Sequence, residues 1–408
     1  MKHIAFLIPT LNRVGGAERQ VVLLAVGLAR RGWRVTLVAL TGTAGEAEAE
    51  LRTAGIAFLS LEMRKGLADP RGWIRLNRWL RRERPEILHA HLSHAAWIAR
   101  WSRFAAPVRV VLDTIHSAGA GTAGRKLGYL CSNWLANQVT AVSQGAADAW
   151  LSARMVPRQL LEVVPNGVDT DAWVPNPAAR TSLRAELKLR EEFLWLAAGR
   201  LEPVKNFSAL LSAFAALPAN AQLVIAGSGS QAEALWSQAR DLGIENRVRF
   251  PGYQSNLLRW MQAADGFILS SLREGLPISL LEAGACALPA VSTAVAGATD
   301  ILVHGQTGFL AYSSTPDALS SSMRRLMETC AAEREAMGES ARLRIEARHS
   351  IHSVLDRWEN LYGELLAHSL IAARKGSWIV RGAFRNLRIK NETAEKPVSP
   401  RGAGASVP

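Results

Sequence analysis

Short apolar runs rich in β-branched residues recur along the chain, and each interval between them has room for one helix. In the first half these runs cover residues 3–8, 34–40, 56–60, 86–90, 108–114, 138–142 and 161–164. Stretches with helical periodicity separate them and start near Gly16, Gly45, Pro70, Leu92, Gly124 and Gln144. Strict alternation of strand and helix is typical of a doubly wound parallel sheet, so we expect an α/β, Rossmann-like fold.

The alternation pauses once and then restarts. Pro165, Pro175 and Pro177 punctuate a polar stretch that suits an interdomain linker near residues 170–180. Strand-like runs resume at 193–198, 222–226, 248–250, 266–269, 290–292 and 308–310, and helices are expected from near Asn206, Ser230, Asn256 and Ile278. We therefore predict Rossmann-like domains over 1–172 and 173–348, a helix over 349–373, and a basic, disordered tail over 374–408.

Length and composition agree with two globular domains. The chain has 408 residues, of which 49% are hydrophobic and 20% charged, which is ordinary composition for a folded protein. The net charge of +13 and the pI near 10.3 are not ordinary. They imply a negatively charged partner: nucleic acid, anionic lipid or a phosphorylated substrate.

Cysteine usage and apolar runs suggest a cytoplasmic setting. Cys131, Cys286 and Cys330 form no CxxC pair, so neither a zinc site nor a disulfide framework is indicated. The apolar run at residues 4–8 is too short for a signal peptide. No apolar run approaches the ~18 residues of a membrane-spanning helix, which leaves binding at a membrane surface open.

A glycine pair, Gly15-Gly16, follows the first strand and opens the next helix, with Glu18 just behind it. Backbone N–H groups at such a turn can face an anion, and the helix dipole adds a favourable field. The alternative is a tight turn in which Glu18 caps its own helix. Phosphate binding and capping both stay open for this motif.

Two cations, Arg200 and Lys205, lie in the loop after the strand 193–198. Ligands of open α/β sheets bind at the carboxyl ends of the strands, where this loop begins. An arginine fork beside a lysine point charge suits a pyrophosphate. The alternative is a pair of solvated surface charges.

Two glutamates mark the next loop and helix. Glu274 follows the strand 266–269, and Glu282 lies just over one turn inside a helix that Pro277 is well placed to start. Apolar neighbours surround Glu282, so its carboxylate needs a partner, and the vicinal hydroxyls of a ribose or a hexose are suitable donors. The alternative is a helix-dipole acid and a satisfied core acid.

In this order the motifs resemble glycosyltransferase family 4, whose members have the GT-B fold of two Rossmann-like domains facing a cleft. The resemblance runs from about residue 3 to about residue 365, and it includes Pro-Asn-Gly-Val-Asp at 165–169 and Gly-Ser-Gly at 227–229. It implies a retaining, metal-independent transfer of sugar from a nucleotide-diphosphate donor, UDP- or GDP-linked, without a cofactor. It also implies that the last helix returns toward the N-terminal domain.

The resemblance assigns roles by position. Arg200 and Lys205 would hold the pyrophosphate, Glu282 the ribose, and Glu274 and His116 would position the reacting sugar. Further donor contacts are implied for Gly15, Gly16, Gly227, Gly229, Ser279 and Leu280, with residues 250–253 lining the base pocket. The leaving diphosphate would accept the acceptor's proton, so the protein would contribute charge stabilisation and positioning.

Two features fit the resemblance less directly. His89, His91 and His94 suggest a metal site, but their spacing matches no single helix face, and a place near the acceptor is the interpretation we favour. The segment 296–300, Ala-Gly-Ala-Thr-Asp, replaces one glycine and the glutamate that the family often carries. The detail of that loop is therefore open.

The stretch 71–82 reads as a basic amphipathic helix. Trp73, Leu76 and Leu80 share one face with Trp79 to the side, and Arg71, Arg75, Arg78 and Arg82 share another. This suits an anionic membrane surface, whereas the alternative is an ordinary crossover helix with a solvated basic face. The tail repeats the basic and aromatic pattern with Lys375, Trp378, Arg381, Phe384, Arg385, Arg388 and Lys390.

These observations predict a cytoplasmic enzyme in peripheral contact with the inner face of the membrane. Its acceptor would be a glycan or a polyprenyl-linked sugar, in the synthesis of cell-surface polysaccharide or glycoconjugate. The alternative from another class is a non-catalytic nucleic-acid-binding protein, but no aromatic-platform motif accompanies the charge. An epimerase or dehydrogenase on the same sheet type would need GxGxxG after the first strand or a YxxxK motif, and neither is present.

Overall fold

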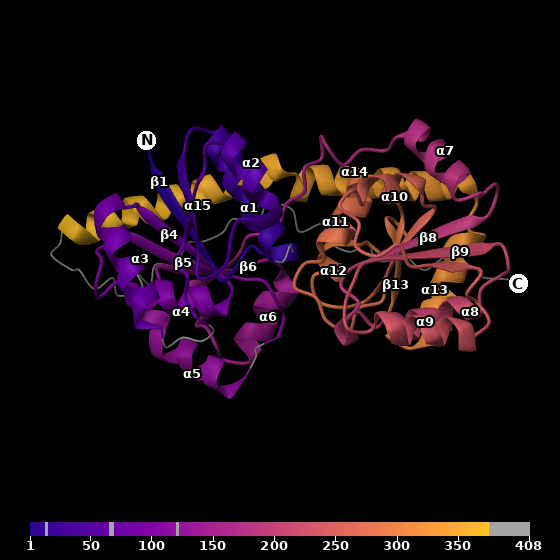
Figure 1. The fold of residues 1–408 in the computed structure, drawn as a ribbon, viewed down its shortest axis with the longest axis horizontal. Coiled ribbons are helices and arrows are strands. Elements are labelled where there is room, and N and C mark those ends of the chain that lie inside the picture. The colour runs from indigo at the N-terminus through magenta and orange to yellow at the C-terminus, as the bar shows by residue number, and fades with distance from the viewer. Residues whose placement is uncertain (13–14, 65–68, 120–121, 375–408) are drawn as a thin grey trace, which may run out of the picture.

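The computed structural model describes residues 1–12, 15–64, 69–119 and 122–374. Strands and helices alternate through two domains that lie end to end, each built on one parallel sheet (Figure 1). The expected α/β class with two Rossmann-like domains is confirmed. The predicted tail, 374–408, lies outside the described residues from residue 375 onward, and so do the basic and aromatic side chains noted there.

The N-terminal sheet has the strand order β3-β2-β1-β4-β5-β6-β7. β1, β4 and β5 are buried along their whole length because helices cover both faces of the sheet, and this explains why most of their residues are apolar on both sides. Helices α1, α2 and α15 pack on one face, and α3, α4, α5 and α6 pack on the other. The strands are β1 (His3–Ile8), β2 (Arg34–Ala39), β3 (Ala57–Ser60), β4 (Ile87–His91), β5 (Val110–Ile115), β6 (Gln138–Ala141) and β7 (Leu161–Val163), and the helices are α1 (Gly16–Arg30), α2 (Glu48–Thr53), α3 (Pro70–Glu83), α4 (Ser93–Ser102), α5 (Ala123–Ser132) and α6 (Gln144–Ser152).

The second sheet has the order β10-β9-β8-β11-β12-β13, again with parallel pairing throughout. Helices α8, α9 and α13 cover one face, and α7, α10, α11, α12 and α14 contribute to the core on the other. The strands are β8 (Phe193–Ala198), β9 (Ala221–Ala226), β10 (Val248–Arg249), β11 (Gly266–Leu269), β12 (Ala290–Thr293) and β13 (Gly308–Ala311), and the helices are α7 (Pro177–Glu186), α8 (Phe207–Ala215), α9 (Ala232–Asp241), α10 (Leu258–Ala263), α11 (Ile278–Ala285), α12 (Ala298–Ile301), α13 (Pro316–Glu328) and α14 (Ala331–His349).

The predicted strands agree with the structure to within two residues at each end. The prediction that residues up to 180 form a loop is wrong at its end, because α7 begins at Pro177. Asn176 caps this helix by accepting hydrogen bonds from the backbone N–H groups of Ala178 and Ala179, both at 3.1 Å. Proline is well suited to a first helical turn, so the residue that was interpreted as a linker signal is a helix start.

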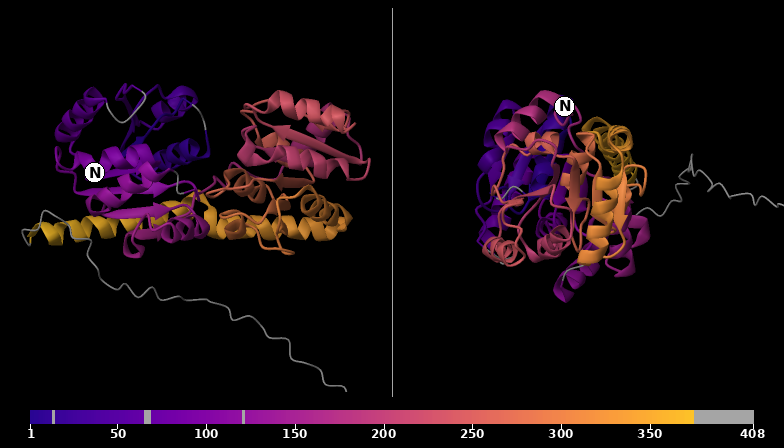
Figure 2. Two further views of the ribbon diagram at one scale, coloured as in Figure 1. Left: turned by 90° about the horizontal axis from the view of Figure 1, so that it is seen from below. Right: turned by 90° about the vertical axis from the view of Figure 1, so that its right-hand side faces the viewer.

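The last helix, α15 (Ile351–Arg374), returns from the second domain and packs along α1 of the first. Figure 2 shows α14 and α15 running along one side of both domains. α1 and α15 come close at Gly27 of α1, where a Cβ would lie 2.6 Å from a methyl carbon of Leu355. Trp358, Leu361 and Tyr362 are buried in the same core as the first strand.

The chain therefore passes between the domains twice, and the two crossings are joined to each other. Val168, on the first crossing, and Ser350, on the second, form a parallel bridge. The backbone N–H of Val168 donates to the carbonyl of His349 at 2.9 Å, and that of Ile351 donates to the carbonyl of Val168 at 2.8 Å. This pair of segments connects the domains at one place.

The packing of α15 predicts that it stabilises the N-terminal domain. Leu361→Ala removes a buried side chain from this core and is expected to cost about 2–5 kcal/mol of unfolding free energy. Leu370→Ala makes the same change on an exposed part of the same helix, where the expected cost is within about 0.5 kcal/mol. Denaturant unfolding of both variants is the measurement, and equal losses would mean that α15 does not belong to this core.

Candidate active site

The residues that the sequence singles out gather where the carboxyl ends of strands from both sheets meet. In the second sheet the chain runs from β8 outward to β9 and β10 and then returns to β11 on the other side of β8. The loops after β8 and β11 therefore diverge around a switch point, which is where open α/β sheets bind ligands. Lys205 follows β8, and Glu274 follows β11.

Lys205 and Glu274 form an ion pair across this switch point. Lys205 Nζ lies 2.7 Å from Glu274 Oε1, and the two side chains are only 17% and 13% exposed. The hydroxyl of Ser271 donates to the same carboxylate oxygen at 2.6 Å. Arg200 is exposed on the solvent side of the first loop. The structure thus holds one cation and one carboxylate in fixed positions, and sequence reasoning had not identified Ser271 as their support.

The loops after β8 and β9 approach each other so closely that only glycine fits. A Cβ on Gly227 would lie 1.9 Å from the carbonyl oxygen of Gly199, and one on Gly229 would lie 2.4 Å from the carbonyl oxygen of Leu201. Any side chain there would push the loops apart. The N–H of Gly227 donates to the carbonyl of Gly252 at 2.8 Å, which brings the segment 250–253 to the same place.

Glu282 lies in α11, only 3% exposed, at the boundary between the domains. Its Oε1 is 3.3 Å from Nη1 of Arg19 in α1. Burial raises the pKa of Glu282 to about 7, while the charge of Arg19 opposes the rise. Sequence reasoning missed Arg19, because nothing along the chain links it to a carboxylate in the other domain. Arg19 contacts one oxygen of the Glu282 carboxyl, so this group can still accept hydrogen bonds from ligand hydroxyls, which is the role that the sequence analysis expected.

The N-termini of α1 and α11 face each other across the boundary. A Cβ on Gly16 would lie 3.2 Å from Cγ1 of Ile278, the first residue of α11. Both helix dipoles therefore direct their positive ends to one place. Ser279 and Leu280 form the facing first turn, in which the N–H of Leu280 donates to the carbonyl of Pro277 at 3.1 Å.

Glu18 covers the glycine turn at the start of α1. Its Oε2 lies 2.5 Å from the position that a Cβ on Gly15 would take. Burial raises the pKa of Glu18, and the backbone N–H groups of Glu18 and Gly15 and the charge of Arg200 act in the opposite direction. The carboxylate of Glu18 therefore lies against the turn at the start of its own helix.

His116 follows β5 and forms a pair with His91 at the end of β4. Nε2 of His116 and Nδ1 of His91 are 2.9 Å apart. Burial lowers the pKa of His116 to about 4 and places that of His91 well below its usual range, so both rings are neutral at pH 7. His89 lies beside them and contacts Tyr362 of α15 through Nδ1 at 2.7 Å. The return of the last helix was expected from the resemblance, but its contact with this histidine cluster was not predicted.

The three histidines that suggested a metal site do not converge. His89 and His91 lie side by side on one face of β4 with ring centroids 4.1 Å apart, whereas His94 is exposed on α4. Within the described part of the chain, no group of three or more His, Cys, Asp or Glu side chains is arranged to hold a metal ion.

The segment that departs from the family pattern lies in the seam between the domains. Asp300, at the place of the usual glutamate, accepts a hydrogen bond from the N–H of Gln144 at 2.7 Å. The hydroxyl of Ser143 donates to the carbonyl of Gly275 at 2.6 Å. A Cβ on Gly297 would lie 2.0 Å from that same carbonyl oxygen, so the glycine that remains in the segment is required by close packing.

The apolar face proposed for membrane contact in residues 71–82 is not available to lipid. Leu76, Trp79 and Leu80 of α3 are buried in the core of the N-terminal domain, and Trp73 packs against them. The interpretation of these apolar residues as a membrane-binding face is therefore wrong, because amphipathic periodicity alone cannot separate a core face from a lipid-binding face. The arginines remain at the surface, where Arg75 pairs with Glu62 at 2.8 Å.

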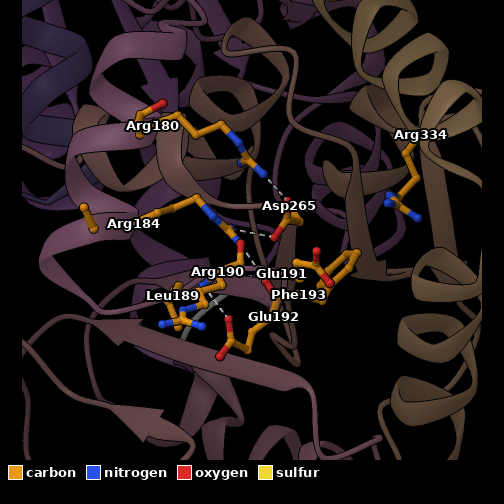
Figure 3. Close-up of a pocket in the computed structure, with 11 residues that line it drawn as sticks. Arg180, Arg184, Leu189, Arg190, Glu191, Glu192, Phe193, Asp265 and Arg334 are labelled. Carbon is orange, nitrogen blue, oxygen red and sulfur yellow. Dashed lines mark hydrogen bonds and ion pairs between the residues drawn. The ribbon is translucent and has the colours of Figure 1, made fainter.

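A hollow of about 530 Å³ lies at the opposite end of the second sheet (Figure 3). Arg180 and Arg184 of α7 point toward Asp265, which pairs with both of them. These charges are used inside the domain to connect α7 to the start of β11. We therefore do not assign this hollow to the site around Lys205.

Two family models match the chain. Glycosyltransferase Family 4 matches residues 14–172, and Glycosyl transferases group 1 matches residues 179–344. Each match coincides with one of the two sheet domains. The chain is a glycosyltransferase of the GT-B fold and belongs to glycosyltransferase family 4.

Relatives and solved structures agree with this assignment. The chain is 25% identical over 319 residues to an Escherichia coli UDP-Gal:α-D-GlcNAc-diphosphoundecaprenol α-1,3-galactosyltransferase, covering 74% of this chain and 81% of the relative. It is 31% identical over 242 residues to a Mycobacterium tuberculosis GDP-mannose-dependent α-(1-6)-phosphatidylinositol monomannoside mannosyltransferase, covering 56% and 60%. The crystal structure of Anabaena HepE in complex with UDP matches with a TM-score of 0.79 at 21% identity, covering 89% of this chain and all of HepE.

None of the described helices combines the length and the apolar character needed to cross a bilayer.

The raised pKa of Glu282 predicts how stability depends on pH. Between pH 4.5 and about 7 the folded state holds a proton that the unfolded state has lost, so the unfolding free energy contributed by this group falls as pH rises through that window. Glu282→Gln removes the effect. The unfolding free energy of the wild type, relative to that of the variant, should fall by roughly 3 kcal/mol from pH 4.5 to 8. The variant is therefore favoured at high pH.

Chemical denaturation of both proteins across this pH range is the measurement. Glu339→Gln, on the exposed surface of α14, is the matched control for losing a glutamate charge. A difference curve for Glu282→Gln that is flat with pH would contradict the assignment of a raised pKa to this carboxyl.

Proposed function

We propose that this glycosyltransferase takes its sugar from a nucleotide-diphosphate donor, UDP- or GDP-linked, and transfers it with retention of configuration and without a metal ion. The observation that carries the proposal is the Lys205–Glu274 pair at the switch point between β8 and β11. A pyrophosphate requires a fixed cation, and a sugar hydroxyl requires a fixed acceptor. Both groups lie beside loops whose backbone a ligand can approach closely, since glycines line them.

The proposed roles follow from the position of each group. Lys205 and Arg200 stabilise the negative charge that grows on the leaving diphosphate. The ionised Glu282 accepts hydrogen bonds from the two ribose hydroxyls. Glu274 and His116 orient the sugar from opposite domains. The positive ends of α1 and α11 add to the field around the phosphates, with the backbone at Gly15, Gly16, Ser279 and Leu280 close by.

The proposed reaction takes place on one face of the sugar. The bond from the anomeric carbon to the diphosphate oxygen breaks, and the diphosphate keeps the electron pair. The acceptor hydroxyl forms its new bond to that carbon from the same side. A diphosphate oxygen takes the proton that this hydroxyl loses, so no side chain of the protein has to act as a base.

The acceptor we propose is a glycan or a polyprenyl-linked sugar, in cell-surface polysaccharide or glycoconjugate synthesis. The names of the two relatives support a lipid-linked acceptor, since one acts on a diphosphoundecaprenol-linked sugar and the other on a phosphatidylinositol mannoside. We accordingly place the enzyme in the cytoplasm, against the inner face of the membrane. The two family matches identify an enzyme and so argue against the alternative of a non-catalytic nucleic-acid-binding protein.

Removing either cation tests the pyrophosphate assignment. Lys205→Ala and Arg200→Ala are each expected to lower kcat/KM by about 10²–10³, the scale for losing one charge that stabilises a transition state. Steady-state kinetics with the preferred donor is the measurement. Arg240→Ala, an exposed cation on α9, is the matched control and should leave turnover unchanged. Full activity in both site variants, with thermal stability intact, would refute the assignment.

A donor panel tests the reaction class. UDP- and GDP-linked sugars are offered with a membrane extract as the source of acceptor, and the products are identified by mass spectrometry. We expect transfer from donors of one base, unaffected by EDTA. Nuclear magnetic resonance of the product should show the anomeric configuration of the donor. A product of inverted configuration, or turnover that stops with EDTA and returns with a divalent cation, would contradict the proposed mechanism.

A further inference from the structure

Large apolar side chains stand exposed together on one side of the N-terminal domain, over α5 and the ends of its neighbours. Phe104 is 66% exposed, Leu127 63%, Trp134 51% and Leu130 48%. We call these four residues the α5 patch. Leu127 and Leu130 are three residues apart and share one side of the helix, and the rings of Phe104 and Trp134 lie 5.8 Å apart. A cluster of this kind marks an interaction surface, whereas single exposed apolar residues are ordinary.

The α5 patch rests on a continuous row of aromatic rings. Trp97 and Trp101 of α4 have ring centroids 6.1 Å apart, Trp101 stacks on Phe104 at 5.7 Å, and Phe104 contacts Trp134. The indole N–H of Trp134 donates to the carbonyl of Cys131 at 2.9 Å. The exposed ring therefore has its polar group satisfied by its own chain, and it can enter an apolar phase without leaving a donor unpaired.

The surroundings of the α5 patch are basic. Asp113 is the only acidic residue between Glu86 and Asp148 in the sequence. It is buried and paired with the equally buried Arg100 at 2.7 Å, so it contributes no negative charge at the surface. Arg125 and Lys126 are exposed on α5 itself. Arg81 of α3 reaches across to the carbonyl of Ala105, next to Phe104.

We propose that the α5 patch docks on the surface of an anionic phospholipid bilayer. Aromatic and leucine side chains surrounded by lysine and arginine are the composition that partitions into the headgroup region, and anionic lipids supply the opposite charge. α5 follows β5 along the chain, so the docked face belongs to the domain that carries His116. The inference deepens the proposed function, because a lipid-linked acceptor is met at a bilayer, and it assigns the contact to α5 instead of α3.

Co-sedimentation of the full chain with vesicles is the test. The probes are vesicles of phosphatidylglycerol mixed with phosphatidylcholine and vesicles of phosphatidylcholine alone. The apolar variant is Leu127→Gln with Leu130→Gln, and its matched control is Leu242→Gln with Leu343→Gln, two exposed leucines of the second domain. The charge variant is Arg125→Gln with Lys126→Gln, matched by Arg71→Gln with Arg78→Gln on α3.

We expect the unchanged protein to bind the mixed vesicles in a salt-sensitive manner. The Leu127/Leu130 variant should lose about tenfold or more of its partition coefficient, because two apolar side chains no longer leave water, while the Leu242/Leu343 control stays unchanged. The Arg125/Lys126 variant should lose binding to mixed vesicles and little of its weaker binding to phosphatidylcholine. Circular dichroism and the thermal midpoint establish that each variant is folded.

Three results would overturn the proposal. Equal loss in both leucine pairs, or in neither, would mean that the α5 patch has no special role. Loss confined to the Arg71/Arg78 variant would move the contact to α3. A change of sedimentation coefficient in the Leu127/Leu130 variant without lipid would assign the patch to a second copy of the chain.

Donor turnover with a water-soluble acceptor, measured on the same variants, separates this inference from the proposed function. Absence of turnover in every protein would refute the proposed function and leave the vesicle result standing. Normal turnover combined with no vesicle binding by the unchanged protein would refute the docking proposal alone.

Discussion

The two domains meet backbone to backbone, and this contact is possible only because the residues at the seam are glycines. A Cβ on Gly275 would lie 2.2 Å from the carbonyl oxygen of His116, and one on Gly145 would lie 2.6 Å from Cβ of Ala296. A side chain at Gly297 is excluded in the same way, because its Cβ would collide with the carbonyl oxygen of Gly275. The loops after β5, β11 and β12 are therefore held in direct contact, and the positions of His116, Glu274 and Glu282 relative to one another depend on that contact.

Around this seam, each buried carboxylate is paired with a residue of the protein, and a ligand that binds the carboxylate would have to share it with that residue. Glu274 is bound by Lys205 and Ser271, and Glu282 by Arg19 of the opposite domain. Each arrangement reduces the cost of keeping a carboxyl in a poorly solvated place. The same pairs fix the side chains in space before any substrate arrives, which is the preorganisation that electrostatic catalysis requires.

The sequence predicted strand boundaries best where a strand is completely buried. Strands such as β1 and β8 are almost entirely apolar on both faces, so their boundaries could be predicted closely, and the order of the motifs indicated the family. Pro177 was misread because a proline ends one element and begins another with equal ease. The pairing of Arg19 with Glu282 could not be found, since it joins residues from different domains. The buried face of α3 has the same periodicity as a lipid-binding face, so only packing could distinguish the two.

The return of α15 to the first domain has a consequence for the order of events during synthesis. Domains generally fold as units as the chain emerges, with the N-terminal one first. Here the core that contains β1 and α1 also contains Trp358 and Tyr362, which the ribosome adds only after the whole second domain. Until then the outer side of α1 lacks its cover. The first domain to be made is thus the last to be completed, and a nascent chain must keep an apolar helix face protected while nearly two hundred further residues, 173–362, are translated.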